Sequence, residues 1–249
     1  MNVLGVILAR EGSVGLRGKH LRSLCGHSVI QYTFDHARAS ELLTSVVVST
    51  DCPQIKKHAA SNGFRVIDRP PELATSSASV QDAMLHAMEN AEAADRSKAD
   101  ALVVLYGNVP LRPPGVIDRA IDLLDQTKCD SVRSFCPVGK WHPAWMSRLI
   151  GDRVEAVTPG SIHRRQDLTP MFFHEGAVVA VSRASMLRGR ANPEDPHAFF
   201  GVDRRGIRTE IGQTVEIDET RDLFLAEAIL RERASHQSES SNICQTRVA

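Results

Sequence analysis

The chain of 249 residues has few aromatic residues, 5% of its length, and no excess of either charge, because 30 Lys and Arg balance 30 Asp and Glu. A neutral protein offers no broad basic face to release counterions, so we expect no nucleic-acid partner and no acidic membrane surface held by bulk electrostatics. The apolar residues 1–9 are too few for a membrane span and lack the basic start of a signal peptide. We expect them to form a buried strand.

Paired cysteines are also not expected. The five cysteines are odd in number and widely spaced, and they form no Cys-x-x-Cys or Cys/His ligand pattern. This pattern favours unpaired thiols in a reducing compartment, and we therefore expect a cytoplasmic protein. The cysteines are Cys25, Cys52, Cys129, Cys136 and Cys244.

The length and the 42% hydrophobic content are typical of one large globular domain. Short apolar runs without alternation indicate strands that are covered on both faces, as in a mostly parallel sheet. They occur at 3–8, 46–49, 64–67, 102–105, 131–135 and 176–181. Residues at helical spacing lie between and after them, at 29–39, 53–62, 79–93, 114–126 and 220–234. The order predicts an α/β fold with a doubly wound, mostly parallel sheet.

Two segments depart from this rhythm. Residues 137–170 contain four prolines and both tryptophans, which predicts an excursion from the main sheet. Residues 235–249 are rich in Ser and Gln and are expected to form a disordered tail. The sequence thus predicts a single domain over 1–234, with the excursion as an arm.

A glycine-rich, basic loop follows the first predicted strand. Gly12, Gly15 and Gly18 allow tight turns and close approach of backbone N–H groups to a ligand, and Arg10 and Lys19 add positive charge. The even spacing of the glycines matches neither the Walker pattern nor Gly-x-Gly-x-x-Gly. The loop could bind a triphosphate, or it could be a solvated turn.

Two carboxylates stand close together before the last helix. Glu216 and Asp218 project to the same side of an extended segment, about 7 Å apart, so both could reach one hard cation such as Mg²⁺. Alternatively, Asp218 caps the following helix and Glu216 is solvated.

Two further segments offer polar side chains for a substrate. Asn108 and Arg112 follow the predicted strand 102–105, at the sheet edge where ligands of open α/β folds lie, although a turn with a helix-starting proline explains the segment equally well. Residues 161–167 include Arg164, Arg165 and Gln166, which could recognise a carboxylate or could form a solvated loop.

Taken together and in order, these segments resemble the acylneuraminate cytidylyltransferase family and the related octulosonate cytidylyltransferases over about residues 3–232. The family loop is matched by Ala9, Arg10, Gly12, Ser13, Gly15 and Lys19. Further matches are 48–51, 69–74, 110–112, 164–168, 176–177 and the acidic motif 216–218. The sequence departs from the family's usual residues at Val14 for Lys, at His20 for Asn, at Tyr106-Gly107-Asn108-Val109 for Gln-Pro-Thr-Ser, and at Glu216 for Asp.

The resemblance implies a nucleotidyltransferase that transfers CMP from CTP to the anomeric hydroxyl of a 2-keto sugar acid, with Mg²⁺ as cofactor. It implies nucleotide binding by the loop residues and Arg69, and a metal site at Glu216 and Asp218. Arg10, Lys19 and Asp218 would act in catalysis. The sugar acid would be bound by Tyr106, Asn108, Arg112, Arg164, Arg165 and Gln166.

The resemblance also implies a homodimer in which the 137–170 arm reaches toward the neighbouring subunit's site. Two other functions fit the same sequence. One is nucleotidyl transfer with another sugar or nucleotide, and the other is a catalytically weak, nucleotide-binding protein with a regulatory role.

Overall fold

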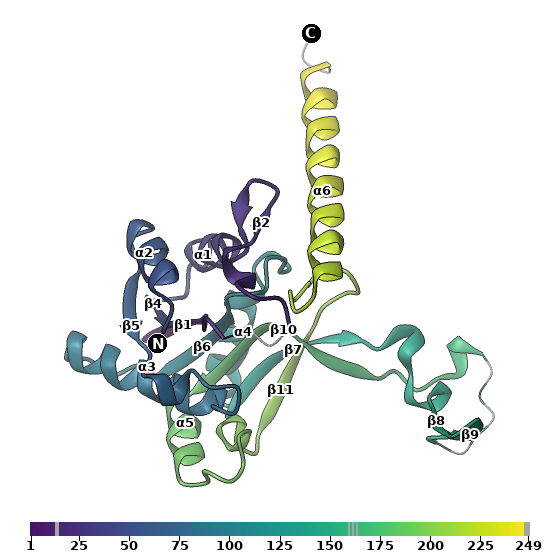
Figure 1. Ribbon diagram of the computed structural model, residues 1–249, viewed down its shortest axis with the longest axis horizontal. Coiled ribbons are helices and arrows are strands. Elements are labelled where there is room, and N and C mark those ends of the chain that lie inside the picture. The colour runs from purple at the N-terminus through teal and green to yellow at the C-terminus, as the bar shows by residue number, and fades with distance from the viewer. Residues whose placement is uncertain (13–14, 159, 161, 163, 247–249) are drawn as a thin grey trace.

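A central sheet of seven strands organises the computed structural model, which describes residues 1–12, 15–158, 160, 162 and 164–246. The strand order is β11-β7-β10-β6-β1-β4-β5 (Figure 1). The strands are β1 (Val3–Leu8), β4 (Ser45–Thr50), β5 (Arg65–Asp68), β6 (Ala101–Tyr106), β7 (Ser131–Pro137), β10 (Phe172–Ser182) and β11 (Arg204–Arg208). Strand β10 is antiparallel to β6 and β7, whereas the other pairings in the sheet are parallel. The predicted mostly parallel sheet is confirmed.

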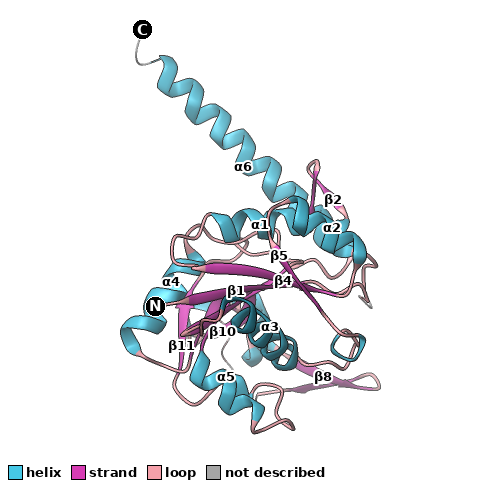
Figure 2. Ribbon diagram, turned by 90° about the vertical axis from the view of Figure 1, so that its left-hand side faces the viewer, coloured by secondary structure: helices cyan, strands magenta, loops and turns pink. Residues whose placement is uncertain are grey.

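Helices cover both faces of this sheet (Figure 2). Helices α1 (Val29–Arg38), α2 (Pro53–Ser61) and α4 (Val116–Thr127) pack on one face, through Phe34, Ile55 and Ile121. Helices α3 (Val80–Asp95) and α5 (Arg183–Arg190) pack on the other, through Met84 and Met186. Since all six residues of β1 are buried, the apolar run at the N-terminus is explained by two-sided burial.

Two elements of the sheet region were not predicted, α5 and β11. Helix α5 is short and carries three arginines, and its helical start depends on Ser182, whose side chain accepts a hydrogen bond from the Ser185 N–H. Strand β11 is an edge strand with four of its five residues exposed, so it has no apolar run to reveal it.

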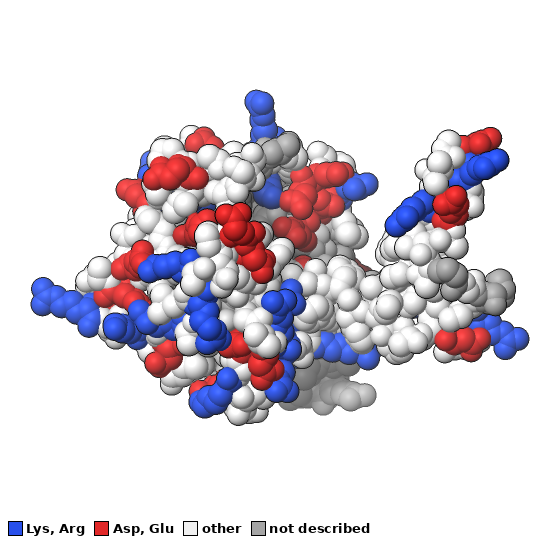
Figure 3. Space-filling view, turned by 90° about the horizontal axis from the view of Figure 1, so that it is seen from below, with Lys and Arg blue, Asp and Glu red and all other residues white. Residues whose placement is uncertain are grey.

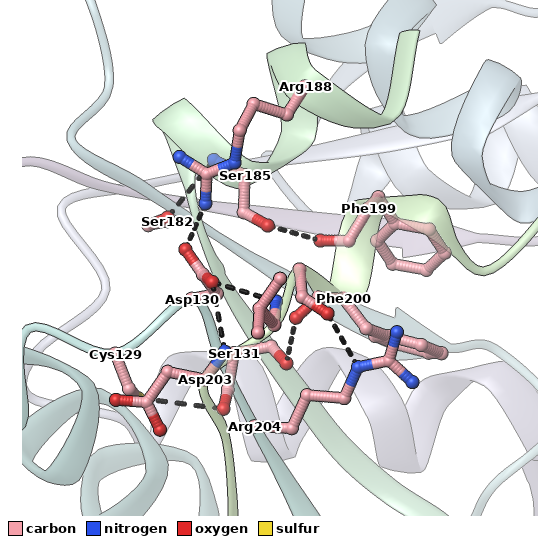
Figure 4. A network of polar contacts seen from close by, with 12 residues as sticks. Cys129, Asp130, Ser131, Ser182, Ser185, Arg188, Phe199, Phe200, Asp203 and Arg204 are labelled. Carbon is pink, nitrogen blue, oxygen red and sulfur yellow. Dashed lines mark hydrogen bonds and ion pairs between the residues drawn. The ribbon is translucent and has the colours of Figure 1, made fainter. Parts of the chain in front are cut away.

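Polar contacts around Asp130 attach the β11 edge to the sheet (Figure 4). The Asp130 carboxylate accepts hydrogen bonds from the Val202 and Asp203 N–H groups at 2.8 and 3.0 Å and pairs with Arg188. These contacts, together with the Arg188 ion pair, hold the pKa of Asp130 below its usual value despite burial, which acts to raise it. The network is structural, since it joins the residues before β11 to the start of β7.

The 137–170 excursion leaves the sheet between β7 and β10 and extends away from it (Figure 1). It carries the hairpin of β8 (Ser147–Ile150) and β9 (Arg153–Ala156), in which every residue is exposed. Its apolar side chains include Leu149 and Val154, which are 74% and 68% exposed. The predicted excursion is confirmed, and it presents an unusually apolar surface. A second small ribbon, of β2 (Ser23–Leu24) and β3 (His27–Ser28), precedes α1.

Helix α6 (Thr220–Thr246) stands out from the body of the molecule (Figures 1 and 2). The sequence predicts a helix ending at Ala234 and a disordered tail beyond it, and the structure differs by continuing the helix through residues 235–246. The segment from 220 to 249 contains no Gly or Pro, so nothing in its sequence stops a helix. The last three residues of the predicted tail, 247–249, lie outside the described residues.

Lys and Arg are interspersed with Asp and Glu on the face shown in Figure 3, as expected for a neutral chain. Within the residues described, no helix is both long and apolar enough to cross a membrane. Cys25, Cys52, Cys129 and Cys136 are free thiols.

Candidate active site

A cavity of about 420 Å³ opens at the carboxyl ends of β1 and β6. Three segments that are distant in sequence meet there: the glycine-rich loop after β1, the turn after β6, and the segment before α6. Its lining consists of Leu8, Arg10, Gly15, Lys19, His20, Arg69, Leu73, Ala78, Ser79, Val80, Ala83, Tyr106, Asn108, Glu216 and Asp218. The position agrees with the sheet edge at which open α/β folds bind ligands.

The glycine-rich loop is joined directly to the acidic segment. The Lys19 ammonium pairs with the Asp218 carboxylate, with 2.6 Å between Nζ and Oδ1. The Leu16 N–H donates to the backbone oxygen of Asp218 at 2.8 Å. A side chain at Gly15 would collide with that same oxygen, so only glycine allows the close approach. The ion pair therefore rests on a fixed backbone contact between segments about 200 residues apart.

Asn108 links the turn after β6 to the same acidic segment. Its side-chain Nδ2 lies 3.0 Å from Glu216 Oε1 and 3.4 Å from Asp218 Oδ1. Its backbone oxygen accepts a hydrogen bond from the Ile217 N–H at 2.8 Å. Glu216 and Asp218 thus converge on one cavity, as the sequence predicts.

Two arginines add positive charge to the cavity wall. The Arg69 guanidinium donates to the hydroxyl and backbone oxygens of Ser49 at 3.0 and 2.7 Å, and burial lowers its pKa to about 10. Arg10 donates to the backbone oxygens of Ala74 and Thr75 at 3.3 and 2.6 Å. Arg10 thereby connects the loop after β1 to the segment that precedes α3.

Tyr106 forms the wall on the β6 side. Burial, followed by the nearby Glu216 charge, raises the pKa of its phenol to about 12. The hydroxyl therefore keeps its proton at neutral pH and can act as a hydrogen-bond donor to a ligand in the cavity.

His20, which also lines the cavity, is 4% exposed. Burial lowers the pKa of its imidazole to about 3, and the charges of Lys19, Arg69 and Arg10 act in the same direction. The ring is neutral at physiological pH, so it adds no fourth cation to this wall.

His20 makes the folded state sensitive to acid. The unfolded chain binds a proton at His20 below pH 6.5 whereas the folded chain resists it down to about pH 3, so stability falls as the pH drops through this window. Urea unfolding at pH 7 and pH 5 should show that the native chain loses about 2 kcal/mol more than the His20→Asn variant. Equal losses in the two proteins would contradict the neutral, buried histidine.

The cavity residues fit a hard divalent cation. Carboxylate oxygens suit Mg²⁺, which is held in proteins by one or two carboxylates together with substrate phosphates and water. No cluster of three or more His, Cys, Asp or Glu able to hold a metal occurs among the described residues, so Glu216 and Asp218 are the carboxylates that would hold a cation in this cavity, with water or substrate oxygens as its further ligands.

Several predicted site residues do not line the cavity. Ala9 and Gly12 belong to the loop but not to the lining, and Ser13 lies outside the described residues. Arg112 is 2% exposed, and its guanidinium donates to the backbone oxygens of Tyr106, Val109 and Ala177 at 2.6 to 2.8 Å. The prediction that Arg112 contacts the sugar is therefore corrected. Its N–H groups donate hydrogen bonds that join the turn after β6 to β10.

The arm residues lie apart from the cavity as well. Arg164, Arg165 and Gln166 are exposed, and Arg165 and Gln166 belong to a short 3-10 turn, Arg165–Asp167. Arg165 lines a second cavity, of about 340 Å³, at the base of the arm. Within one subunit they do not meet the nucleotide-loop residues.

Sequence reasoning missed the wall formed by residues 73 and 78–83. This wall includes the start of α3, where the Ser79 side chain accepts a hydrogen bond from the Asp82 N–H at 3.0 Å. The Ser-rich stretch at 75–79 and the Asp three residues after Ser79 are a helix-start signal. That signal predicts where the helix begins, but it does not show that the start of the helix lines the cavity.

The sequence matches a known family model, described as cytidylyltransferase, over residues 4–248. It is 30% identical over 195 residues to an N-acylneuraminate cytidylyltransferase of Streptococcus agalactiae serotype III (strain NEM316), covering 77% of this chain and 46% of that protein. It thus spans about half the length of this relative. It is 27% identical over 237 residues to a CMP-N,N'-diacetyllegionaminic acid synthase of Legionella pneumophila (strain Philadelphia 1), covering 92% and 97% of the two chains.

The fold is similar to a solved structure of CMP:2-keto-3-deoxy-manno-octonic acid synthetase complexed with CTP. The TM-score is 0.72 at 19% sequence identity, and the match covers 94% of this chain and all of the other. At this identity the likeness concerns the fold, and it agrees with the doubly wound sheet described above.

Proposed function

Because this chain belongs to the cytidylyltransferase family, we propose that it transfers CMP from CTP to the anomeric hydroxyl of a 2-keto sugar acid and releases pyrophosphate. The sugar acid is sialic acid or a related nonulosonic acid, the acceptor class named for the two relatives. The observation that carries the proposal is the single cavity in which Lys19, Arg10 and Arg69 face Glu216 and Asp218. Cations for a triphosphate and carboxylates for a metal are both needed for nucleotidyl transfer.

In the proposed reaction the anomeric hydroxyl attacks the α-phosphorus of CTP. A new P–O bond forms, the bond between the α-phosphorus and the bridging oxygen breaks, the hydroxyl proton passes to water, and pyrophosphate leaves. Lys19 and Arg10 bind the β- and γ-phosphates and stabilise the negative charge that grows on the leaving group. Arg69, which lines the same cavity, contacts the nucleotide. The Tyr106 hydroxyl donates a hydrogen bond to the sugar acid.

Glu216 and Asp218 would hold Mg²⁺. The bound cation would neutralise phosphate oxygens and lower the pKa of the attacking hydroxyl. Asp218 has a second role in the absence of substrate, since it pairs with Lys19 and keeps that ammonium group at the cavity.

The enzyme acts as a homodimer in this proposal, with the 137–170 arm completing the neighbouring site. Two observations support it: the apolar side chains of the arm are exposed, and Arg164, Arg165 and Gln166 lie away from their own subunit's cavity. The free cysteines and the neutral surface suit the cytoplasm.

We expect the exposed apolar side chains of the arm to stabilise a dimer. Burying Leu149 and Val154 against a second copy removes apolar surface from water, so sedimentation should give a dimer for the native chain. The double variant Leu149→Asp and Val154→Asp should shift the protein toward monomer and lower turnover. A native chain that sediments as a monomer at assay concentration contradicts the shared site.

The proposed activity is tested by pyrophosphate release from CTP and Mg²⁺ with a panel of eight- and nine-carbon keto sugar acids. We expect release with at least one nine-carbon acid and none when EDTA removes the metal. Release only with an eight-carbon acid would correct the acceptor. Binding of CTP without release for any acceptor would favour a nucleotide-binding, regulatory protein.

A further inference from the structure

Asn108 contacts all three residues of the acidic motif 216–218, although it was expected to bind the sugar acid. Its side-chain Nδ2 lies 3.0 Å from Glu216 Oε1, 3.0 Å from the Ile217 backbone oxygen and 3.4 Å from Asp218 Oδ1. The residue is 5% exposed, and it follows β6 directly in the turn that Arg112 holds in place. A rigid, buried amide therefore meets both proposed metal ligands.

The orientation of this amide is set by its surroundings. The backbone oxygen of Ile217 can only accept a hydrogen bond, so the NH₂ end of the Asn108 side chain must face it. The same NH₂ group has two hydrogens and three acceptors, so it donates to the Ile217 oxygen and to Glu216 Oε1 at 3.0 Å and shares a hydrogen with Asp218 Oδ1 at 3.4 Å. The Ile217 N–H, which donates to the Asn108 backbone oxygen at 2.8 Å, fixes the distance between the two segments.

Glu216 and Asp218 need a hydrogen-bond donor between them to stay close together. Glu216 and Asp218 are like charges that face the same cavity, and their side chains would separate if no donor lay between them. Lys19 pairs with Asp218 Oδ1, so of the two carboxylates it orients that of Asp218. Asn108 touches Glu216 through Oε1, while the other oxygen, Oε2, lies toward Gly176, where an added Cβ would be 3.5 Å away. Among the described residues, hydrogen bonds and the ion pair engage Oε1 of Glu216 and Oδ1 of Asp218, which leaves the second oxygen of each carboxylate for a ligand.

We propose that Asn108 is a positioning residue that holds Glu216 and Asp218 in the geometry required to bind the divalent cation. The inference rests on the proposed function, in which these two carboxylates hold Mg²⁺. Hydrogen-bond partners of metal ligands commonly contribute 10- to 100-fold to metal affinity. Asn108 acts here by donating hydrogen bonds to the acidic segment.

The test is direct binding of Mn²⁺ to the full chain without nucleotide, followed by the EPR signal of free Mn²⁺. Asn108→Ala should weaken Mn²⁺ binding by roughly 10- to 100-fold. Asn108→Leu has nearly the same size but neither a hydrogen-bond donor nor an added charge, so it should also weaken binding. Asn90→Ala, which removes an exposed amide that donates only to the His86 backbone oxygen at 2.8 Å, is the matched control and should bind as the native chain does.

Two results would overturn the inference. Native Mn²⁺ affinity in Asn108→Ala would mean that the amide does not position the carboxylates. Native affinity in Asn108→Leu, which removes the donor without adding charge, would mean that the carboxylates hold their positions without this hydrogen bond. Thermal unfolding of each variant shows whether it is folded, and the Asn108→Leu variant keeps the test decisive if the alanine variant is unstable.

Failure of the proposed function gives a different result. Mn²⁺ binding that depends on Asn108 and is lost in Asp218→Asn, without CMP transfer to any acceptor, would retain the positioning role and reject the enzyme. In an active enzyme, Asn108→Ala should raise the Mg²⁺ concentration for half-maximal turnover while the KM for CTP at saturating Mg²⁺ stays within about threefold of the native value.

Discussion

Asp218→Ala should lower the turnover of CTP with its sugar-acid acceptor by roughly two to three orders of magnitude. Asp218 combines three contacts that no neighbouring residue can replace: the Lys19 ammonium at 2.6 Å, the Asn108 amide at 3.4 Å, and the Leu16 N–H at 2.8 Å on its backbone oxygen. Only the first two depend on the side chain. The variant should therefore keep its loop in place while losing a metal ligand and the partner of Lys19.

The measurement is kcat at saturating CTP over a range of Mg²⁺ concentrations. Partial recovery at high Mg²⁺ would agree with a weakened metal site. The matched control is Asp125→Ala, because Asp125 pairs with Lys128 at the same 2.6 Å on the remote helix α4. Near-native turnover in Asp218→Ala would remove the proposed metal site.

Lys19→Ala should lower kcat by a similar factor, roughly two to three orders of magnitude, for a different reason. The ammonium group lies in the loop after β1, is 14% exposed as a side chain, and lines the same cavity as Arg69. Its contribution is largest when charge accumulates on the leaving pyrophosphate, so kcat should fall more than the affinity for CTP does. Lys128→Ala is the control.

A double variant separates the two roles of Lys19. Residues in contact give non-additive effects, so Lys19→Ala combined with Asp218→Ala should lose less than the product of the single losses. Fully multiplicative losses, or near-native kcat in Lys19→Ala, would contradict a shared site.

Much of the fold could be predicted because a strand or helix that packs against the core carries a recognisable pattern of apolar residues. The apolar runs in β1 and β6 and the helical spacing in α1 and α4 each reflect a face of the core. Helix α5 and strand β11 could not be predicted, because these Arg-rich, half-exposed segments carry no apolar pattern. Their position depends on tertiary contacts such as those of Asp130. Helix α6 extends past the predicted end. The helical spacing of apolar residues ends near Ala234, but the following residues include no Gly or Pro and can continue the helix.

The candidate site was predictable only in part, because sequence motifs name residue types but do not show how they are partnered. Lys19 and Asp218 were each proposed, yet their contact depends on backbone packing of Gly15 against residue 218. Arg112 was assigned to the sugar because of its place after β6, although its burial against three carbonyl oxygens makes it structural. The acceptors of Asn108, likewise, lie more than 100 residues away in the chain.

The most direct test of the central claim is the mass of the product formed from CTP, Mg²⁺ and a nine-carbon keto sugar acid, with pyrophosphate measured in the same reaction. The account predicts a CMP-sugar acid and one equivalent of pyrophosphate with CTP, and neither with ATP, GTP or UTP. A nucleotide product made equally well from another triphosphate, or release of inorganic phosphate with no CMP-sugar, would contradict it.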